Sequence, residues 1–456
     1  WCLARSRGAG TEREAARHVR ELLQTLGPAY AKLGQAVSAR PDVLPPAFVD
    51  ELSLLQDAIP PFDDELALAE LERQLGVPTA AVFESLGTGA VAGASLGQVY
   101  RGVLRPEYGG GEVAVKVQRP GVRGVIGMDV LLLRLASAAA RRAVRANTDL
   151  PRLVDEWGAS LFRELDYRNE ARNGARFGRL FAGGEGDVRV PRMYPQLTTR
   201  TVLVMEWVRG TPLTELPPSD PDNLRLVNIG VQCSLAQLLD EGFYHADPHP
   251  GNLMRTEGGQ LAYIDFGMCG TLPPSVRDGL VAAAVHLVNR EYGALSEDFV
   301  SLELLPRDAD KGKVAPALTG VFKEAIRGGV TQVSFSELAV KLGQTMYEYQ
   351  FRIPPYYTLI IRSLALLEGI ALKADPDFKV LGSAYPWVAR KVLTDPDPAL
   401  RDTLRGLLYD GDGAFQFGRL QSMLAQAQRS GRAAPAAGAH GEEPRREKLR
   451  RGGALS

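Results

Sequence analysis

The chain has few of the residues that build disulfide frameworks or zinc sites. It contains three cysteines and five histidines in 456 residues. Cys2, Cys233 and Cys269 have neither disulfide-framework nor zinc-ligand spacing, which favours a reducing compartment. We expect Cys269, which lies beside a motif described below, to be a small buried side chain rather than a reactive thiol.

An excess of one charge is also absent, as is a long apolar run. The 53 basic and 54 acidic residues give a net charge of -1, so we expect no overall attraction to nucleic acid or to an anionic membrane. No stretch of about 18 uncharged apolar residues occurs. The longest candidate, 358–372, contains Arg362 and Glu368, which favours a buried helix. The sequence begins at Trp1 rather than Met, so a targeting peptide would lie outside it.

The pattern along the chain changes several times. Residues 11–80 have the apolar spacing of helices. Strand-like alternation begins near Phe83 and includes "GEVAVKVQ", and a long helix is expected over about 155–180. After the strand "RTVLVMEW" the pattern is mostly helical to about residue 428, and the Ala-, Gly- and charge-rich remainder is typical of a disordered tail.

Two short stretches hold an unusual set of polar residues. "YHADPHPGN" begins at Tyr244 and places Asp247 five residues before Asn252. "AYIDFGMCG" follows and contains Asp265 within an Asp-Phe-Gly triplet. Upstream, "VAVK" ends an alternating strand with Lys116.

Phosphoryl transfer needs this kind of set. A carboxylate orients the acceptor, metal ligands and a lysine hold the phosphates, and a backbone loop covers them. Each motif alone is weak, but their order and their predicted elements agree with the protein-kinase pattern. We therefore predict Asp247 as the catalytic carboxylate, Lys116 as the phosphate lysine, and Asn252 and Asp265 as Mg²⁺ ligands for bound ATP.

His245 and His249 could instead suggest a zinc site. Pro248 and Pro250 break the helix that would bring the two rings together, and no cysteine or third histidine is near. We favour hydrogen bonds that shape the loop for both histidines.

The predicted phosphate loop departs from the kinase pattern G-x-G-x-x-G-x-V. Alanine replaces the first two glycines, and each added Cβ limits the approach of backbone to phosphate. We expect a stiffer loop that holds the nucleotide differently. Its residues read Ala92-Gly93-Ala94-Ser95-Leu96-Gly97-Gln98-Val99.

Two further departures concern regulation and substrate. Ala246 stands where kinases regulated by loop phosphorylation usually carry arginine. No Ala-Pro-Glu motif follows Asp265, and the segment is already interrupted by Pro273 and Pro274. The segment after Asp265 is therefore too short for the usual protein-substrate platform.

Together these features resemble the UbiB family (AarF-domain, activity-of-bc1-complex kinases) of atypical protein-kinase-like proteins. The resemblance runs from about residue 15 to 409. Its lysine-x-glycine-glutamine motif reads Lys32-Leu33-Gly34-Gln35, its alanine-rich loop reads Ala92-Gly93-Ala94-Ser95, and its glutamate-x-aspartate motif reads Glu164-Leu165-Asp166. The Gly93 is a departure from the commoner triple alanine.

The resemblance implies an α+β, bilobal protein-kinase-like fold, with ATP and Mg²⁺ as cofactors. It also implies a helical N-terminal extension over the active site, in which the motif lysine meets the glutamate-x-aspartate pair and occludes protein substrates. The implied parts are residues 1–82 as the extension, 83–210 as the N-lobe, 211–380 as the C-lobe, 381–428 as C-terminal helices and 429–456 as a disordered tail.

The spacing of the acidic residues agrees with the pairing that the resemblance implies. Glu164 and Glu170 are six residues apart, about 240° on one helix, so only one of them can face Lys116. We assign Glu170 to Lys116, and Glu164 with Asp166 to Lys32. Gln35 is placed with this regulatory group, and Glu206 is expected to line the nucleotide site.

The family implies support of isoprenoid-quinone biosynthesis. Stretches such as "GPAYAKLGQAVSARPDVLPP" resemble the plant-plastid and cyanobacterial branch, where plastoquinone and tocopherol are the associated lipids. We expect a chloroplast location (plastoglobule or thylakoid) for an algal or plant protein, and a cytoplasmic or peripheral-membrane location for a cyanobacterial one. A homodimer is also expected.

Three functions compete at this point. The first is an ATPase or small-molecule kinase that acts in a lipid pathway, the second a true protein kinase, and the third a nucleotide-binding scaffold with little turnover. The short segment after Asp265 counts against the second. The intact set of Lys116, Asp247, Asn252 and Asp265 counts against the third.

Overall fold

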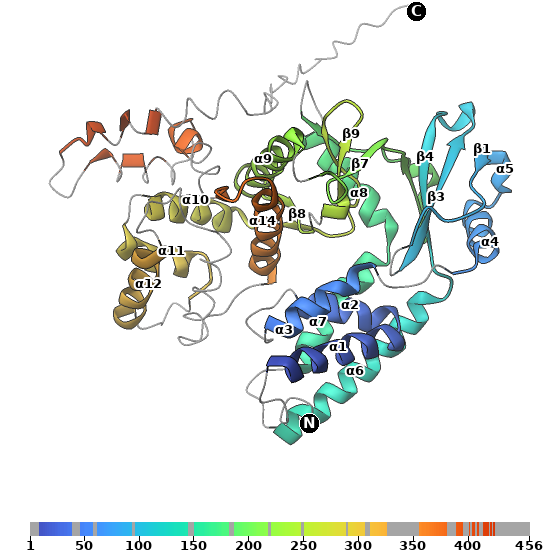
Figure 1. Cartoon of the computed structure of the whole chain (residues 1–456), viewed down its shortest axis with the longest axis horizontal. Coiled ribbons are helices and arrows are strands. Elements are labelled where there is room, and N and C mark those ends of the chain that lie inside the picture. Colours follow the sequence, from blue (N-terminus) through green and yellow to red (C-terminus); the bar gives the residue numbers. More distant parts are fainter. Residues whose placement is uncertain are drawn as a thin grey trace, which may run out of the picture.

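The structure is a computed structural model with a sheet-containing lobe, a mostly helical lobe and a bundle of helices beside them (Figure 1). It describes residues 9–394 and short stretches between 401 and 424. The undescribed residues within 9–394 are 39–45, 58–61, 94–95, 145–149, 182–186, 218–219, 248–249, 289–290, 306–310, 326–354 and 381–388. Cys2 and the expected tail, 429–456, lie outside the described residues.

The N-lobe is an antiparallel sheet with the strand order β1-β3-β4-β6, and β2 pairs with β3. Alternating β-branched residues form its central strands, as the sequence predicts. The strands are β1 (Phe83–Leu86), β2 (Ala92–Gly93), β3 (Gly97–Leu104), β4 (Glu112–Gln118) and β6 (Val202–Glu206).

The two faces of this sheet have different surroundings. Successive side chains of a strand point to opposite faces. Val113, Val115 and Val117 of β4 are fully buried in one cluster with Leu71 of helix α4 (Asp64–Leu75), which covers the outer face. Lys116 therefore points to the inner face, toward the other lobe. The short helix α5 (Thr79–Val82) leads into the sheet.

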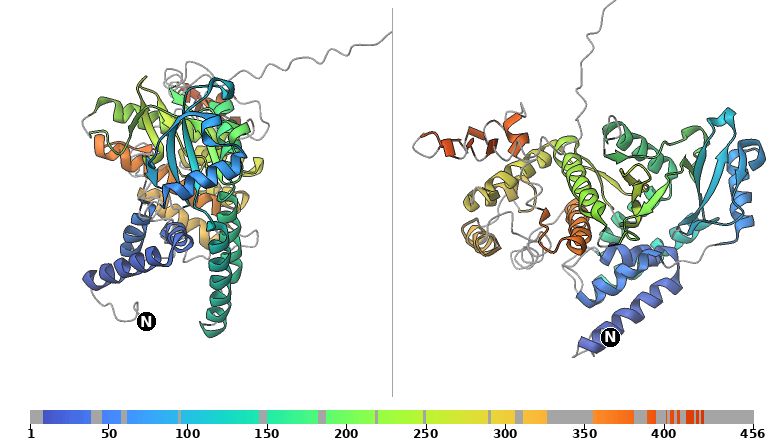
Figure 2. Two further views of the ribbon diagram at one scale, coloured as in Figure 1. Left: turned by 90° about the vertical axis from the view of Figure 1, so that its right-hand side faces the viewer. Right: turned by 45° about the horizontal axis from the view of Figure 1, so that its top comes forward.

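A bundle of helices extends from the inner side of the N-lobe (Figures 1 and 2). Ala29 of α2 packs with Ile126 of α6 and Leu161 of α7 in a separate small core. The bundle consists of α1 (Ala9–Leu26), α2 (Pro28–Ser38), α3 (Pro46–Ser53), the 3-10 turn η1 (Leu54–Asp57), α6 (Val122–Val144) and α7 (Leu150–Glu164).

The single helix expected over 155–180 is wrong. The structure has two helices, α7 and α8 (Tyr167–Phe181), with a corner at Leu165 and Asp166. The Asp166 carboxylate accepts a hydrogen bond from the Arg168 backbone N–H at 3.1 Å, which is how an aspartate caps a helix N-terminus. Glu164 and Glu170 thus lie on different helices, and the angular argument that separated them does not apply.

The C-lobe places the quoted motifs on short strands and the turns beside them. One sheet has the order β5-β10-β9-β7, and a second pairs β8 with β11. These strands are β5 (Val188–Arg189), β7 (Gly210–Pro212), β8 (Phe243–His245), β9 (Leu253–Thr256), β10 (Leu261–Tyr263) and β11 (Cys269–Thr271). The stretch after β6, expected to be mostly helical, therefore contains five strands by residue 271.

Helices surround these strands and form the main core. α9 and α14 pack together, and Glu368 of α14 is fully buried, so the interrupted apolar run is a buried helix as expected. The C-lobe helices are α9 (Pro221–Ala236), the π-helical turn η4 (Gln237–Glu241), α10 (Pro274–Val288), α11 (Tyr292–Ser301), α12 (Lys311–Ala325) and α14 (Pro355–Ala374).

The expected α+β class is confirmed by this arrangement. None of the described helices combines the length and the apolar character that a membrane crossing needs.

A partly buried ion pair between α10 and α11 predicts a pH dependence of stability. His286 Nδ1 lies 2.7 Å from the Asp298 carboxylate, and this hydrogen bond raises the pKa of His286 above its ordinary 6.5, although burial opposes the shift. A raised folded pKa gives stability that is fully present below pH 6.5 and is lost as pH rises through the folded pKa.

We expect the free energy of unfolding to fall as pH rises from 6.5 to 8, and this fall to shrink in His286→Gln, which keeps a donor but does not titrate. Urea unfolding at several pH values measures this. An identical pH profile in the variant would exclude His286 as the source of the pH dependence of stability.

Candidate active site

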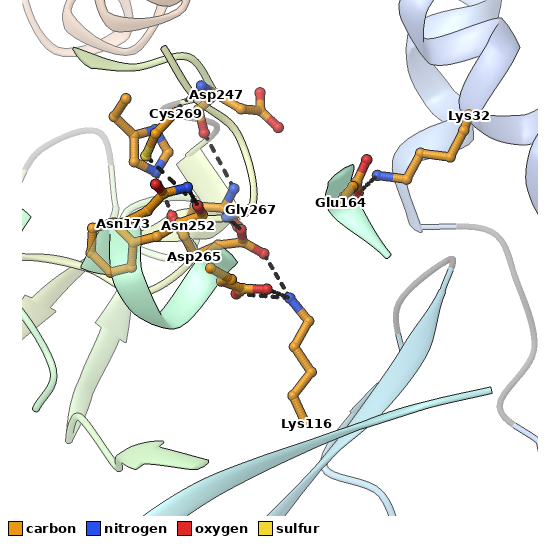
Figure 3. Close-up of polar contacts among 12 residues, drawn as sticks. Lys32, Lys116, Glu164, Asn173, Asp247, Asn252, Asp265, Gly267 and Cys269 are labelled. Atoms are coloured by element: carbon orange, nitrogen blue, oxygen red, sulfur yellow. Dashed lines mark hydrogen bonds and ion pairs between the residues drawn. The ribbon is translucent and has the colours of Figure 1, made fainter. Parts of the chain in front are cut away.

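Lys116 joins three elements at the centre of the site. Its Nζ lies 3.0 and 3.1 Å from the two carboxylate oxygens of Glu170, and 3.2 Å from Oδ2 of Asp265 (Figure 3). Lys116 comes from β4, Glu170 from the first turn of α8, and Asp265 from the segment after β10. The predicted pairing of Lys116 with Glu170 rather than Glu164 is present, although on a different helical geometry.

The three charges differ in burial. The Glu170 side chain is 4% exposed, that of Lys116 13%, and that of Asp265 39%. Burial raises the pKa of Glu170 to about 7, although Lys116 opposes the rise. Burial also acts to raise the pKa of Asp265, but Lys116 and the Gly267 amide outweigh it and lower that pKa to about 2. Asp265 is therefore ionised at neutral pH and open on one side.

The Asp-Phe-Gly triplet is fixed by its backbone. The Gly267 N–H donates to Asp265 Oδ1 at 2.9 Å, and Asn173 Nδ2 of α8 donates to the Phe266 carbonyl at 2.9 Å. The Phe266 ring is fully buried, with its centroid 5.3 Å from that of Phe177. These contacts leave Asp265 Oδ2 directed at Lys116.

His245 links the loop that contains Asp247 to this triplet. It is 3% exposed, and its Nε2 is hydrogen-bonded to the Asp265 carbonyl, while its Nδ1 accepts the Asp247 N–H at 3.2 Å. A carbonyl can only accept, so the proton is on Nε2 and the ring is neutral. The expected loop-shaping role is present for His245; His249 lies outside the described residues.

The catalytic-loop residues meet the triplet at one edge of the C-lobe sheet. Leu253 pairs with Tyr263, and the Ile264 N–H donates to the Asn252 carbonyl at 3.1 Å. Asn252 Nδ2 donates to the Asp247 carbonyl at 3.3 Å. The structure thus brings Asp247, Asn252 and Asp265 to the same edge.

Lys32 meets Glu164 but not Asp166. The Lys32 ammonium forms an ion pair with Glu164, in which the two side chains are 18% and 22% exposed (Figure 3). Asp166 instead pairs with Arg168, with Nη2 to Oδ2 at 2.7 Å, so that part of the prediction is wrong. The reason is local, because a residue that caps α8 uses its carboxylate at the start of its own helix. Gln35 lies on α2, and its side chain is outside the described residues.

The predicted phosphate loop includes β2 and the start of β3, which pair in antiparallel register. Val99 of β3 pairs with Ala92 on one side and with Lys116 on the other. A Cβ on Gly97 would collide with the Val117 carbonyl and lie 2.8 Å from the Tyr167 hydroxyl, so only glycine fits there. Ala94 and Ser95 lie outside the described residues.

The Glu206 side chain forms its polar contacts away from Lys116. Its carboxylate pairs with Arg189 and accepts the Arg192 N–H at 3.0 Å. It lines a cavity of about 590 Å³ that also includes Trp207 and Arg209. Its side chain is therefore not among the groups gathered around Lys116.

Cys269 behaves as expected. It is partly buried, its Sγ lies 3.7 Å from the Phe266 carbonyl, and burial raises the pKa of its thiol. A thiol held in its protonated form is a poor nucleophile.

Sequence reasoning missed Asn173 and Tyr167. Asn173 reaches the Phe266 carbonyl from three residues beyond Glu170, a spacing that places both on one face of α8. Tyr167 is 1% exposed, and its ring centre lies 5.2 Å from Lys116 Nζ. Nothing in the sequence pattern marks either residue.

The matches to known families and proteins agree with this geometry. The model of the ABC1 atypical kinase-like domain matches residues 54–299, and that of the UbiB helical domain matches residues 323–379. Similar curated proteins include an uncharacterized aarF domain-containing protein kinase, chloroplastic, of Arabidopsis thaliana, 54% identical over 91% of this chain and 59% of its own length.

Two others extend the comparison to a named kinase and to a cyanobacterium. Protein ACTIVITY OF BC1 COMPLEX KINASE 3, chloroplastic, of Arabidopsis thaliana is 46% identical over 90% of this chain and 57% of its own length. A protein of Synechocystis is 44% identical over 91% of this chain and 74% of its own. The chain spans about six-tenths of the length of the first curated relatives it matches.

A solved structure shares the fold. The complex of Rv3197 with erythromycin from Mycobacterium tuberculosis has a TM-score of 0.55 and 24% identity, over 80% of this chain and 94% of that one.

The Tyr167 hydroxyl gives a prediction about stability. Within the described residues it is buried without a hydrogen-bond partner, which costs about 1–3 kcal/mol. We expect Tyr167→Phe to raise the free energy of unfolding by about 1 kcal/mol in urea titrations, since the ring contact with Lys116 is kept.

Tyr100→Phe is the matched control. Tyr100 is equally buried, but its hydroxyl donates to Asp64 at 2.6 Å, so this variant should lose stability. A loss of similar size in Tyr167→Phe would show that its hydroxyl has a partner.

Proposed function

Because the chain belongs to the ABC1/UbiB family of atypical kinase-like proteins, we propose that it binds Mg-ATP at Lys116 and transfers or hydrolyses the terminal phosphoryl group. The observation that carries this proposal is the position of Lys116 between Glu170 and Asp265. A buried lysine that two carboxylates hold in place is a suitable fixed cation for phosphate oxygens.

The donor set suits Mg²⁺. Asp265 offers a carboxylate that is ionised and partly exposed, and Asn252 an amide oxygen at the same sheet edge. Mg²⁺ is usually held by one or two carboxylates together with substrate phosphates. Bound there, it would neutralise charge on the phosphates. The described residues contain no cluster of three His, Cys, Asp or Glu side chains that could hold an ion alone.

Asp247 would position the acceptor. It is partly buried on the loop that His245 fixes, and an aspartate there can accept the proton of an attacking hydroxyl or water. A nucleotide role for Glu206 would fall to its backbone, because its carboxylate is paired with Arg189.

We favour a small-molecule or lipid-pathway acceptor in prenylquinone metabolism. α10 begins at Pro274, nine residues after Asp265, and β11 within that interval pairs with β8. This segment leaves little room for a peptide platform, and Lys32 ties α2 to α7 beside the site. The alternatives are a protein kinase that acts on enzymes of that pathway and a low-turnover nucleotide-binding scaffold.

We propose a cellular location from the names and organisms of the relatives. Names marked chloroplastic and matches in Synechocystis support a chloroplast or cyanobacterial protein. Within either, we propose a peripheral position on a thylakoid or plastoglobule surface, and a homodimer.

ATP turnover tests the function. We expect Asp247→Asn to keep Mg-ATP binding in a thermal-shift titration but to lower ATP turnover by about 10²-fold or more. Asp265→Asn should lose the Mg²⁺-dependent part of binding, because the phosphate-bridging ion loses its carboxylate.

The two variants separate the alternatives. A scaffold predicts equal, minimal turnover in wild type and Asp247→Asn. Unchanged Mg-ATP affinity in Asp265→Asn would place the metal elsewhere. Adding prenylquinone-precursor mimics distinguishes a lipid-pathway enzyme, whose turnover they should change, from a protein kinase.

Lys32 gives a prediction about substrate access. Lys32→Ala leaves the partly buried Glu164 without its cation, which weakens the contact between α2 and α7. We expect this variant to phosphorylate its own residues on incubation with Mg-ATP, as mass spectrometry would show, and to lose its native function.

The control is Arg134→Ala, which breaks an exposed ion pair with Asp155 between α6 and α7 in the same bundle. It should gain no phosphosites. Absence of new phosphosites in a folded Lys32→Ala variant would contradict a covering role for α2.

A further inference from the structure

Gln237 is a buried amide that lies behind the candidate site. It is 1% exposed and is the first residue of the π-helical turn η4. Its side-chain oxygen accepts the His245 backbone N–H at 2.7 Å, and its Nε2 lies 3.2 Å from Cys233 Sγ. A buried amide is costly unless it is hydrogen-bonded, and here both ends of the group have a partner. The chemistry proposed above gives this residue no role.

The turn that Gln237 begins determines where its side chain lies. α9 ends at Ala236, and η4 follows it without a break. Gly242, whose φ is +59°, ends η4 and leads directly into β8. The backbone N–H of His245, eight residues along the chain, thereby returns to the Gln237 side chain. Single π-helical turns are rare and occur frequently at functional sites.

The edge of β8 that faces away from β11 needs an acceptor. Within the described residues β8 pairs with β11 alone. The Ala246 N–H is directed at this partner strand and donates to the Met268 carbonyl at 2.9 Å. Backbone N–H groups alternate in direction along an antiparallel strand, so the N–H of His245 points to the other edge. The Gln237 oxygen stands there in the place of a third strand's carbonyl.

This bond bears on the two aspartates through the His245 ring. The ring is hydrogen-bonded to the Asp265 carbonyl and accepts the Asp247 N–H at 3.2 Å. Its other neighbours are aromatic rings, with the centroids of Phe177 and Phe266 at 6.2 and 5.7 Å. Such rings pack against the imidazole, whereas the bond to Gln237 fixes the backbone that carries it.

We propose that Gln237 is a positioning residue for phosphoryl transfer. Through His245 it sets the place of Asp247, which would orient the acceptor, relative to Asp265, which would hold Mg²⁺. The proposal rests on the function proposed above and adds a residue that touches neither nucleotide nor metal. A displacement of about 1 Å in a catalytic group lowers a rate by about 10²-fold, so one buried hydrogen bond is enough to affect kcat.

The two ends of the Gln237 amide differ in strength. Burial raises the pKa of the Cys233 thiol to about 11, so the thiol is protonated at neutral pH and its sulfur is a weak acceptor. The oxygen accepts a backbone N–H at 2.7 Å, which is the stronger contact. A substitution that keeps an oxygen at this position should therefore keep the function, and one that removes the oxygen should not.

Steady-state ATP turnover tests the proposal. Gln237→Met keeps the length of the side chain and removes its acceptor. We expect kcat to fall about tenfold or more as Asp247 is displaced, and KM for Mg-ATP to change less than about threefold. The reason for the small change in KM is that Lys116 and Glu170 lie on other elements. Gln237→Glu keeps an acceptor oxygen and should restore kcat to within about threefold of wild type.

Asn223→Leu is the matched control. Asn223 is a buried amide, 5% exposed, near the opposite end of α9, and its Nδ2 donates to the Pro217 carbonyl at 2.6 Å. This variant should lower the melting temperature as Gln237→Met does, but it should leave kcat unchanged. Gln237→Asn, which keeps the amide and shortens the side chain by one methylene, is a milder second variant. It should lower kcat in the same direction as Gln237→Met.

Hydrogen exchange separates this proposal from the enzymatic one. Exchange is followed by mass spectrometry, without nucleotide, in peptides covering residues 243–247 and 264–268. We expect faster exchange in both peptides of Gln237→Met and in neither peptide of Asn223→Leu. If the wild-type protein turns over no ATP, the enzymatic function fails, while the exchange result still decides whether Gln237 positions these two segments.

Three results would overturn the proposal. The first is an unchanged kcat in a folded Gln237→Met or Gln237→Asn variant, which would reduce Gln237 to core packing. The second is a kcat of Gln237→Glu as low as that of Gln237→Met, because the acceptor oxygen would then be irrelevant. The third is faster exchange of equal size in Asn223→Leu, which would reflect a general loss of stability.

Discussion

The buried ammonium of Lys116 is the constraint on which the site depends. A cation taken out of water must be paired, and removing a partner from such a group is far more costly than breaking a surface pair. Here the partners come from α8 and from the segment after β10. Lys116 therefore links the N-lobe sheet, α8 and the C-lobe through one side chain. The same arrangement leaves Asp265 ionised and partly open.

His245, a neutral histidine, holds the segments of Asp247 and Asp265 together. One ring nitrogen of His245 is hydrogen-bonded to the Asp265 carbonyl and the other to the Asp247 backbone N–H. The backbone N–H of His245 donates to the Gln237 side-chain oxygen at 2.7 Å. Its ring lies 5.7 Å from that of Phe266 in an aromatic cluster. The two aspartates are thus fixed through their backbones by one side chain.

The sequence could predict the features that depend on the order of the motifs and on the alternation of side chains along a strand. Alternation along one strand places Lys116 opposite Val115 and Val117, and the Asp-x4-Asn spacing places Asn252 after Asp247 on one loop. It could not predict the corner at Leu165 and Asp166. Apolar periodicity continues across that corner, and only the capping bond of Asp166 to Arg168 ends one helix and starts the next. The surroundings of Tyr167 and the pairing of Glu206 depend on packing between segments far apart in the sequence, which no local pattern records.

That corner also determines how the N-terminal bundle can act on the site. Glu164 ends α7 and holds Lys32 of α2, while Glu170 lies in the first turn of α8 and holds Lys116. Only the capped corner separates them, and the Gln118 amide fixes it by donating to the Leu165 carbonyl at 3.1 Å. A shift of α2 therefore reaches Glu170 through a short, hydrogen-bonded connection rather than through a flexible loop.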